Sequence, residues 1–406
     1  MYLLALFVDA LRYDYINSED SPFLYEAIQS KRIRQLRSKP VLGFTHTATA
    51  SIYTGTWPRT HGRWVYWGNK KGEEADVYPV QKIFRLIPEK KIRLFAKHGF
   101  SYLLELLKSP ASEWFMPNLP ENMAPFFCRL TPVFNLDQSV GHIPTLFGIL
   151  RKMKIDYSFK NIESLDIKDF EVKIPISDKD VFVNVLSYGH LDHTGHIYGP
   201  SSQPISKEVQ KLDQFICGLF NKLSRITSDL HLVVFTDHGM TKVEKRFNLQ
   251  GLIEALRMRS GLDYLAFYDS TMARFWFMNE RARSIIIASL KKLQYGKILE
   301  KSDLKKLGLD FGNNNYGDLI FLMNVGCEIF PNYFVSILPS WIRQYKGMHG
   351  FDVEDPSQQG AFLYSGSLSE QIITETIEAV DFLPTILHIL KLPIPQYCEG
   401  SSIFKH

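Results

Sequence analysis

The sequence predicts an α/β protein with a doubly wound, mostly parallel sheet and helices on both faces. Three short apolar runs, Tyr2–Val8, 181–187 and 230–236, have the length and composition of strands buried in a parallel sheet. Each run leads directly into a cluster of Asp, His and Gly residues. A helical pattern separates the second run from the third, so strand, helix and strand form a βαβ unit, whose usual consequence is a parallel sheet.

Two segments are predicted to be buried helices. Between the second and third strands, apolar residues recur at spacings of three and four, which is the period of one helix face. They are Ile205, Val209, Leu212, Ile216, Leu219 and Leu223. Ser202 and Pro204 precede them as start signals. Residues 379–390 are mostly apolar and carry Pro384 close to the first turn, which also favours a buried helix.

Composition indicates a large globular protein. A chain of 406 residues exceeds the usual single domain, so one catalytic domain with an insertion, or two domains, is expected. The apolar fraction of 45% is ample for a core and excludes a disordered chain. A net charge of +4 is too small to indicate a nucleic-acid partner. The four cysteines lie far apart, so we expect free, mostly buried thiols.

The first apolar run does not resemble a signal peptide, because it ends at Asp9 and has neither a basic leader nor a small-residue cleavage site. No segment approaches the roughly 20 apolar residues that a membrane-spanning helix needs. We therefore expect a soluble protein located in the cytoplasm.

Domain organisation follows from these elements. We expect the catalytic core to comprise residues 1–62, 150–245 and 345–406. Residues 246–344 alternate strand-like and helix-like segments, which predicts a small α+β cap. Residues 63–149 are rich in aromatics and prolines and are expected to form an insertion. Within it, a stripe formed by Phe100, Leu103, Leu104, Leu106 and Leu107 predicts a packed core helix; the alternative is a lipid-facing lid with peripheral contact to a membrane.

Six acidic and imidazole side chains are candidate metal ligands. They are Asp9, Asp192, His196, Asp237, His238 and His349. Taken singly, such an Asp is commonly a helix N-cap and such a His a surface residue. However, the carboxyl ends of parallel strands meet at one edge of a sheet, where several carboxylates are unfavourable without a cation. Mixed carboxylate and imidazole ligands suit Zn²⁺ or Mn²⁺.

A candidate nucleophile lies in the hydroxyl-rich segment GFTHTATASIYTGTWPRTHG, residues 43–62. A hydroxyl beside a divalent cation becomes a competent nucleophile because the metal favours its alkoxide. A helix N-terminus at the same place would direct backbone N–H groups at phosphoryl oxygens. Thr47, Thr49 and Ser51 are alternatively read as hydroxyls that cap a helix.

These motifs together resemble the alkaline phosphatase superfamily, and most closely its type I phosphodiesterases and nucleotide pyrophosphatases. That branch has an Asp after the first strand and a Thr ten residues before the Gly of a T-G-x-x-P-x-x-H-G element. It continues with D-x-x-G-H-x-x-G-P, D-H-G-M and a late G-x-H-G. Here the same pattern appears at Asp9, at Thr45 before Gly55, and at residues 192–200, 237–240 and 347–350.

The resemblance implies an alkaline-phosphatase-like fold and a two-metal site that hydrolyses small-molecule phosphate esters or diesters. It implies one divalent cation, Zn²⁺ or Mn²⁺, at Asp192, His196 and His349. The second would be held by Asp9, Asp237 and His238. Thr45 would bind this second cation and attack phosphorus, giving a phospho-threonine intermediate.

One departure from the family pattern concerns the substrate. The third residue after the nucleophile is Asn in the nucleotide pyrophosphatases and Ala48 here, so His46, Thr47 or Arg12 would have to supply the missing donor. A phosphomonoesterase or phosphonate hydrolase is therefore an alternative, as is a non-catalytic metal-binding scaffold. A sulfatase would need Cys or Ser where Thr45 stands.

Overall fold

The computed structural model describes residues 1–69, 83–84, 86–107, 119–120, 122–130, 139–166, 181–333, 344–366 and 371–405. Contacts between residues divide the chain into two compact units. The first comprises Met1–Trp64, Phe134–Lys242 and Asp352–His406, and the second comprises Val65–Val133 and Val243–Phe351.

The first unit is built on a seven-stranded sheet in the order β19-β2-β18-β9-β1-β8-β7. The strands are β19 (Thr376–Glu378), β2 (Arg34–Lys39), β18 (Gly360–Ser365), β9 (Leu230–Phe235), β1 (Tyr2–Val8), β8 (Phe182–Tyr188) and β7 (Asp156–Asn161). β1 pairs in parallel with β8 and β9, and β7 pairs in parallel with β8. β18 runs antiparallel to both β2 and β9. The three predicted apolar runs are thus three adjacent interior strands, β9, β1 and β8.

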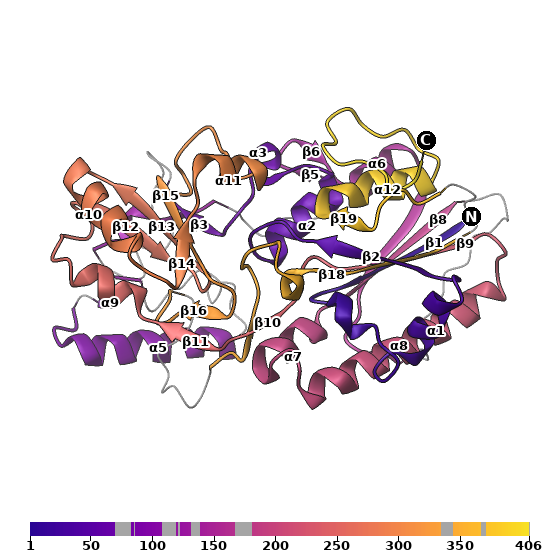
Figure 1. Ribbon diagram of the computed structural model, residues 1–406, viewed down its shortest axis with the longest axis horizontal. Helices are drawn as coiled ribbons and strands as arrows, with labels where there is room; N and C mark the ends of the chain where they lie inside the picture. Colours follow the sequence, from indigo (N-terminus) through magenta and orange to yellow (C-terminus); the bar gives the residue numbers. More distant parts are fainter. Residues whose placement is uncertain are drawn as a thin grey trace. The chain divides into compact units, whose positions relative to one another are not determined.

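Helices cover both faces of this sheet (Figure 1). Alternate side chains of β1 point to opposite faces, because a strand has a period of two. Tyr2, Leu4 and Leu6 share a core with α1 (Pro22–Gln29) and α8 (Gln203–Ser224). Leu3, Ala5 and Phe7 share the other core with α2 (Thr45–Thr54), α6 (Leu146–Lys152) and α12 (Phe382–Ile389). The predicted doubly wound architecture and both predicted buried helices, α8 and α12, are confirmed.

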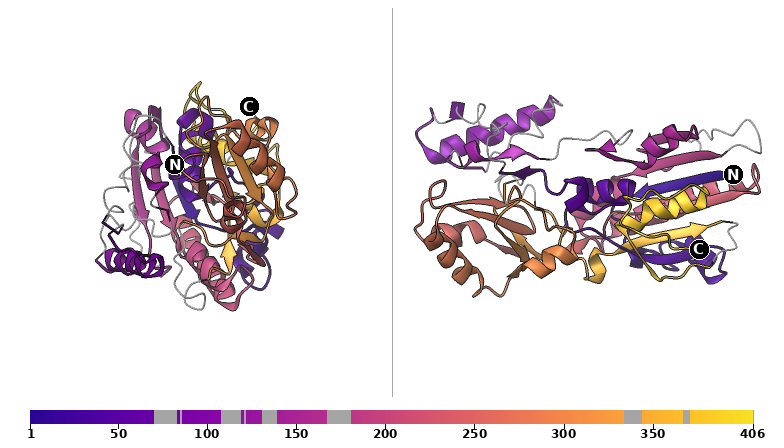
Figure 2. Two further views of the ribbon diagram at one scale, coloured as in Figure 1. Left: turned by 90° about the vertical axis from the view of Figure 1, so that its left-hand side faces the viewer. Right: turned by 90° about the horizontal axis from the view of Figure 1, so that it is seen from above.

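The second unit contains a four-stranded antiparallel sheet in the order β12-β13-β15-β14 (Figure 2). The strands are β12 (Tyr264–Tyr268), β13 (Met272–Phe277), β15 (Leu319–Met323) and β14 (Gly296–Ile298). Its helices are α5 (Lys90–Leu106), α9 (Leu249–Glu254), α10 (Glu280–Leu290) and α11 (Lys301–Lys306). Two short pairs complete it, namely β3 (Trp67–Gly68) with β4 (Cys128–Arg129), and β11 (Lys245–Phe247) with β16 (Cys327–Ile329).

Part of the expected insertion belongs to the core of this second unit. Trp67 and Phe127 are buried in the same cluster as Phe267 and Trp276. The ring of Phe127 lies edge-on to those of Phe267 and Trp276, with centroids 5.1 and 5.4 Å away. Trp67 and Phe127, two aromatic residues of the expected insertion, are therefore buried against the α+β sheet.

Two further expectations concern the whole chain. All four cysteines are free. Within the described ranges, none of the helices combines the length and the apolar character that crossing a bilayer requires.

Candidate active site

The candidate ligands of the first unit gather at the carboxyl edge of the central sheet. Asp9 directly follows β1, and Asp237 and His238 follow the end of β9 by two and three residues. Asp192 lies in α7 (His190–Tyr198), which begins two residues after β8. Since β1 is parallel to both neighbours, the three strand ends coincide, as expected for a ligand site in an open α/β sheet.

One group consists of Asp9, Asp237 and His238, each of which offers a ligand atom within 4.8 Å of the others. His238 Nε2 lies 3.4 Å from Asp9 Oδ1 and 3.1 Å from Asp237 Oδ2. His238 Nδ1 is 2.9 Å from the Gly239 carbonyl oxygen, which can only accept. Nδ1 therefore donates to this carbonyl oxygen, and Nε2 lies on the side of the two carboxylates, from which it could bind a metal ion.

The electrostatics of this group fit a cation. Burial raises the pKa of Asp9, and the charges of Asp237 and Asp192 raise this pKa further. Burial also raises the pKa of Asp237, against the effect of His238. Asp9 Oδ1 and Asp237 Oδ2 are buried and accept no hydrogen bond. A divalent cation bound to these oxygen atoms would neutralise their negative charge. The donor set therefore fits the metal that the family resemblance implies.

A second pair of candidate ligands lies on α7. His196 Nε2 is 3.3 Å from Asp192 Oδ1, because a spacing of four residues places both side chains on the same helix face. A ligand atom of Asp192 also lies within 4.8 Å of a ligand atom of His238. The pair formed by Asp192 and His196 therefore lies next to the first group. His349 is buried and belongs to the second unit, three residues before the chain returns to the first unit at Asp352. Its role as a ligand stays a prediction.

Thr45 is the first residue of α2, and its Oγ1 lies 3.1 Å from His238 Nε2. The hydroxyl is thus beside the candidate metal group, at the positive end of a helix, which favours an anionic phosphoryl group. Thr49, one turn later, donates from its Oγ1 to the Thr45 carbonyl oxygen at 2.6 Å. The predicted nucleophile and the predicted ligands Asp9, Asp237 and His238 are therefore brought together.

The T-G-x-x-P-x-x-H-G element holds α2 in place, a role that its sequence alone does not reveal. Gly55 ends α2 with φ 67°, a left-handed conformation that favours glycine. His61, in α3 (Pro58–His61), is buried with Nε2 3.0 Å from Ser51 Oγ. His61 Nδ1 accepts from the backbone N–H of Arg63, so Nε2 donates to Ser51. Burial lowers the pKa of His61 to about 3, which keeps the ring neutral.

All three predicted phosphate donors have structural partners. Arg12 donates from Nε and Nη2 to the two carboxylate oxygens of Asp14 at 2.8 and 2.5 Å, and from Nη1 to the Met240 carbonyl oxygen at 2.8 Å. Thr47 is buried and donates to the carbonyl oxygen of Trp64. His46 is half-buried directly after Thr45. His46 Nε2 lies 3.4 Å from Thr47 Oγ1. The predicted substrate contacts of Arg12 and His46 stay predictions.

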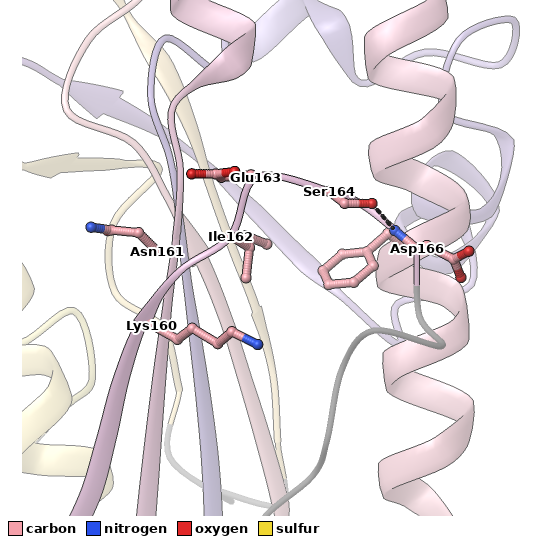
Figure 3. A pocket seen from close by; sticks show the side chains of 7 residues that line it. Lys160, Asn161, Ile162, Glu163, Ser164 and Asp166 are labelled. Atoms are coloured by element: carbon pink, nitrogen blue, oxygen red, sulfur yellow. Dashed lines mark hydrogen bonds between the residues drawn. The ribbon is translucent and has the colours of Figure 1, made fainter. Parts of the chain in front are cut away.

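A pocket of about 270 Å³ lies where β7 ends (Figure 3). Its lining includes Lys160, Glu163 and Asp166, with Ser164 accepting from the Asp166 backbone N–H at 3.2 Å. β7 is the parallel neighbour of β8, which leads to Asp192. Side chains of both charges therefore lie along the same edge of the sheet as the candidate ligands.

Comparison with known proteins gives a consistent result. Residues 3–352 match the family described as "Type I phosphodiesterase / nucleotide pyrophosphatase". Ectonucleotide pyrophosphatase/phosphodiesterase family member 7 of Rattus norvegicus is 33% identical over 262 residues, which cover 62% of this chain and 56% of that protein. An uncharacterized pyrophosphatase/phosphodiesterase of Schizosaccharomyces pombe is 24% identical over 244 residues, 54% of this chain and 47% of that protein. The chain thus matches about half the length of these relatives.

Solved structures confirm the predicted alkaline-phosphatase-like fold. Human ectonucleotide pyrophosphatase/phosphodiesterase 5 has a TM-score of 0.62 at 15% identity, covering 98% of this chain and 97% of that one. An inactive variant of the murine protein in complex with AMP has a TM-score of 0.59 at 14% identity, with the same coverage.

Proposed function

The chain belongs to the type I phosphodiesterase/nucleotide pyrophosphatase family, and from this membership we propose that it hydrolyses small phosphodiesters or pyrophosphates with Thr45 as nucleophile. The observation that carries the proposal is the position of Thr45 Oγ1, 3.1 Å from His238 and beside the buried carboxylates. A hydroxyl at a helix N-terminus next to a cation-binding group is the arrangement that attack on phosphorus requires.

Two divalent cations, Zn²⁺ or Mn²⁺, are proposed as cofactors. Asp9, Asp237 and His238 would hold one of them. Asp192 and His196 would hold the other, with His349 as its predicted third ligand. When bound, such cations neutralise phosphoryl oxygens and favour the alkoxide form of a neighbouring hydroxyl.

The roles of the chain's own groups follow from their positions. The Oγ of Thr45 would lose its proton to solvent and attack phosphorus while the bond to the leaving oxygen breaks, giving a phospho-threonine that still carries the second ester group of the substrate. Water would then break the bond between Oγ and phosphorus, which restores the Thr45 hydroxyl and releases a phosphate monoester. The N-terminus of α2 would face the phosphoryl oxygens, and His46 would donate to one of them in place of the amide that Ala48 lacks.

The proposed substrate is a small phosphate ester. A solved relative holds AMP, which supports this size and chemistry for the present chain. Because Ala48 replaces the amide, we keep a phosphomonoesterase or phosphonate hydrolase as the second candidate. Turnover of bis-p-nitrophenyl phosphate, compared with p-nitrophenyl phosphate, separates the two. The cytoplasmic location remains a prediction from the sequence.

The deciding experiment compares the wild type with Thr45→Ala in Mn²⁺ or Zn²⁺. We expect Thr45→Ala to abolish turnover of both chromogenic esters and Thr45→Ser to retain part of it. Thr60→Ala, a half-buried threonine in α3, is the matched control and should keep wild-type activity. Full activity in Thr45→Ala would refute the assignment of the nucleophile. A wild type that binds metal but turns over no ester would favour the scaffold alternative.

A further inference from the structure

Helix α5 of the second unit (Figure 1) carries exposed apolar side chains. Ile92, Phe95, Leu103 and Leu106 follow the three- and four-residue spacing of one helix face, with the exposed Gly99 between them. Phe95 is 80% exposed and Leu106 is 68% exposed. These four apolar side chains form what we call the α5 stripe.

The opposite side of α5 faces inward. Lys97 is 2% exposed, and its Nζ donates to the Leu119 carbonyl oxygen at 3.4 Å. Leu104 is buried, and the ring of Phe100 lies 5.7 Å from that of Phe84. The helix thus buries a lysine while phenylalanine and leucine are exposed, the reverse of the arrangement expected for a helix that faces water.

This finding corrects one expectation from the sequence. The residues predicted to form a packed core helix were Phe100, Leu103, Leu104, Leu106 and Leu107. Among them only Leu104 is buried, whereas Leu103, Leu106 and Leu107 are exposed. The reason is rotational: the helix is oriented by the contacts of Lys97, Phe100 and Leu104, which turn the leucines at 103, 106 and 107 outward.

We propose that the α5 stripe docks the protein on a lipid bilayer that contains anionic headgroups. Charge complementarity identifies this partner. Apart from the buried Lys97, the Lys and Arg residues of α5 are Lys90, Lys91 and Arg93, all in its first turn, and Glu105 is its one acidic residue. A helix with an apolar face and a basic first turn lies in the plane of a membrane interface, where both features are satisfied together. At 17 residues, α5 would lie along the surface rather than span it.

Vesicle flotation of the full-length chain tests this proposal. The probe is a vesicle of phosphatidylcholine alone, or with about one third phosphatidylglycerol, a fraction that gives a negative surface potential. We expect flotation with the anionic vesicles only, weakened at high salt because the headgroup attraction is screened. Phe95→Asp with Leu106→Asp should lower the bound fraction about tenfold or more, since both side chains lose their transfer into lipid.

A matched control uses exposed apolar residues elsewhere in the same unit, Leu262→Asp with Met278→Asp, which should float like the wild type. Both double variants should show the wild-type circular dichroism, because all four positions are exposed. Absence of wild-type flotation, or equal flotation of Phe95→Asp with Leu106→Asp, would overturn the proposal. So would light scattering that shows a dimer lost in that variant without any vesicle binding. Turnover of a soluble ester should be unchanged throughout, so this test is independent of the proposed catalytic function.

Discussion

Thr45 Oγ1 and His238 Nε2 lie 3.1 Å apart, although 193 positions separate the two residues in the sequence. This contact joins the N-terminus of α2 to the carboxyl end of β9, and it places a hydroxyl beside two buried carboxylates. The relationship is the geometric core of the site, because it unites the candidate nucleophile with a candidate metal ligand.

Metal binding should stabilise the folded chain. A ligand that binds only the native state adds about 4 kcal/mol at a thousandfold excess over its dissociation constant, so the melting temperature should rise with added Zn²⁺ or Mn²⁺. Asp237→Asn removes a carboxylate from the group and should reduce this rise. Asp156→Asn alters an exposed carboxylate at the start of β7 and serves as the control. Equal thermal shifts in both variants would contradict the assignment of Asp237 as a ligand.

His46 and Arg12 are expected to differ in their effects on catalysis. His46→Ala should lower kcat by about a hundredfold to a thousandfold, because one donor to the transition state is lost. Arg12→Ala should mainly lower stability, since its guanidinium contacts Asp14 and the Met240 carbonyl oxygen. Steady-state kinetics alongside urea unfolding separates the two results. If Arg12→Ala lowers kcat more than His46→Ala at unchanged stability, the roles are reversed.

His61 should make stability depend on pH. Its folded-state pKa of about 3 lies below the ordinary value near 6.5 because of burial, so the folded protein binds this proton less readily than the unfolded chain. The contribution of neutral His61 to the free energy of unfolding is therefore complete above about pH 6.5 and is lost progressively as the pH falls towards 3. Its upper bound is on the order of 4–5 kcal/mol.

The variant His61→Gln tests this dependence, because its amide can still donate to Ser51 and does not titrate. Urea unfolding at a series of pH values should give the variant a shallower loss of stability between pH 6.5 and 3 than the wild type. Parallel curves would show that His61 does not carry this pH dependence.

The buried ion pair of the second unit should be essential to its stability. Arg274 donates from Nε to Asp269 at 2.8 Å and from Nη1 to the Trp67 carbonyl oxygen at 2.6 Å, and both charged residues are fully buried. Asp269→Asn leaves the guanidinium without its counter-charge, which typically costs about 3–5 kcal/mol. Arg259→Ala, which removes an exposed ion pair with Asp263, should change urea unfolding little. Similar losses in both variants would contradict this account.

Local sequence patterns were sufficient to predict that the candidate ligands Asp9 and Asp237 lie at the carboxyl edge of the central sheet. The continuous apolar character of β1 and β9 follows from burial on both faces, and Asp9 and Asp237 follow those strands directly. The apolar residues from Ile205 to Leu223 recur with the period of a helix because they form the face of α8 that packs on the sheet. These features depend on neighbours in sequence, and a single sequence records them well.

Features that depend on distant contacts could not be predicted in the same way. The guanidinium of Arg12 meets Met240, and Trp67 meets Arg274, each more than 200 positions away. The rotation of α5, which buries Lys97, is set by a carbonyl oxygen at Leu119 and not by the period of the helix. No local rule of propensity or spacing contains these partners.

The place of β18 in the central sheet has a consequence for biosynthesis. β18 lies between β2 and β9 but spans Gly360–Ser365, close to the end of the chain. At translation rates of about 5–20 residues per second, a growing chain would wait tens of seconds before this gap could be filled. Until then β2 and β9 would each present an unpaired edge to other nascent chains. The sheet is therefore expected to close only after residues 236–359 have been synthesised, and the growing chain should benefit from a chaperone that shields those edges meanwhile.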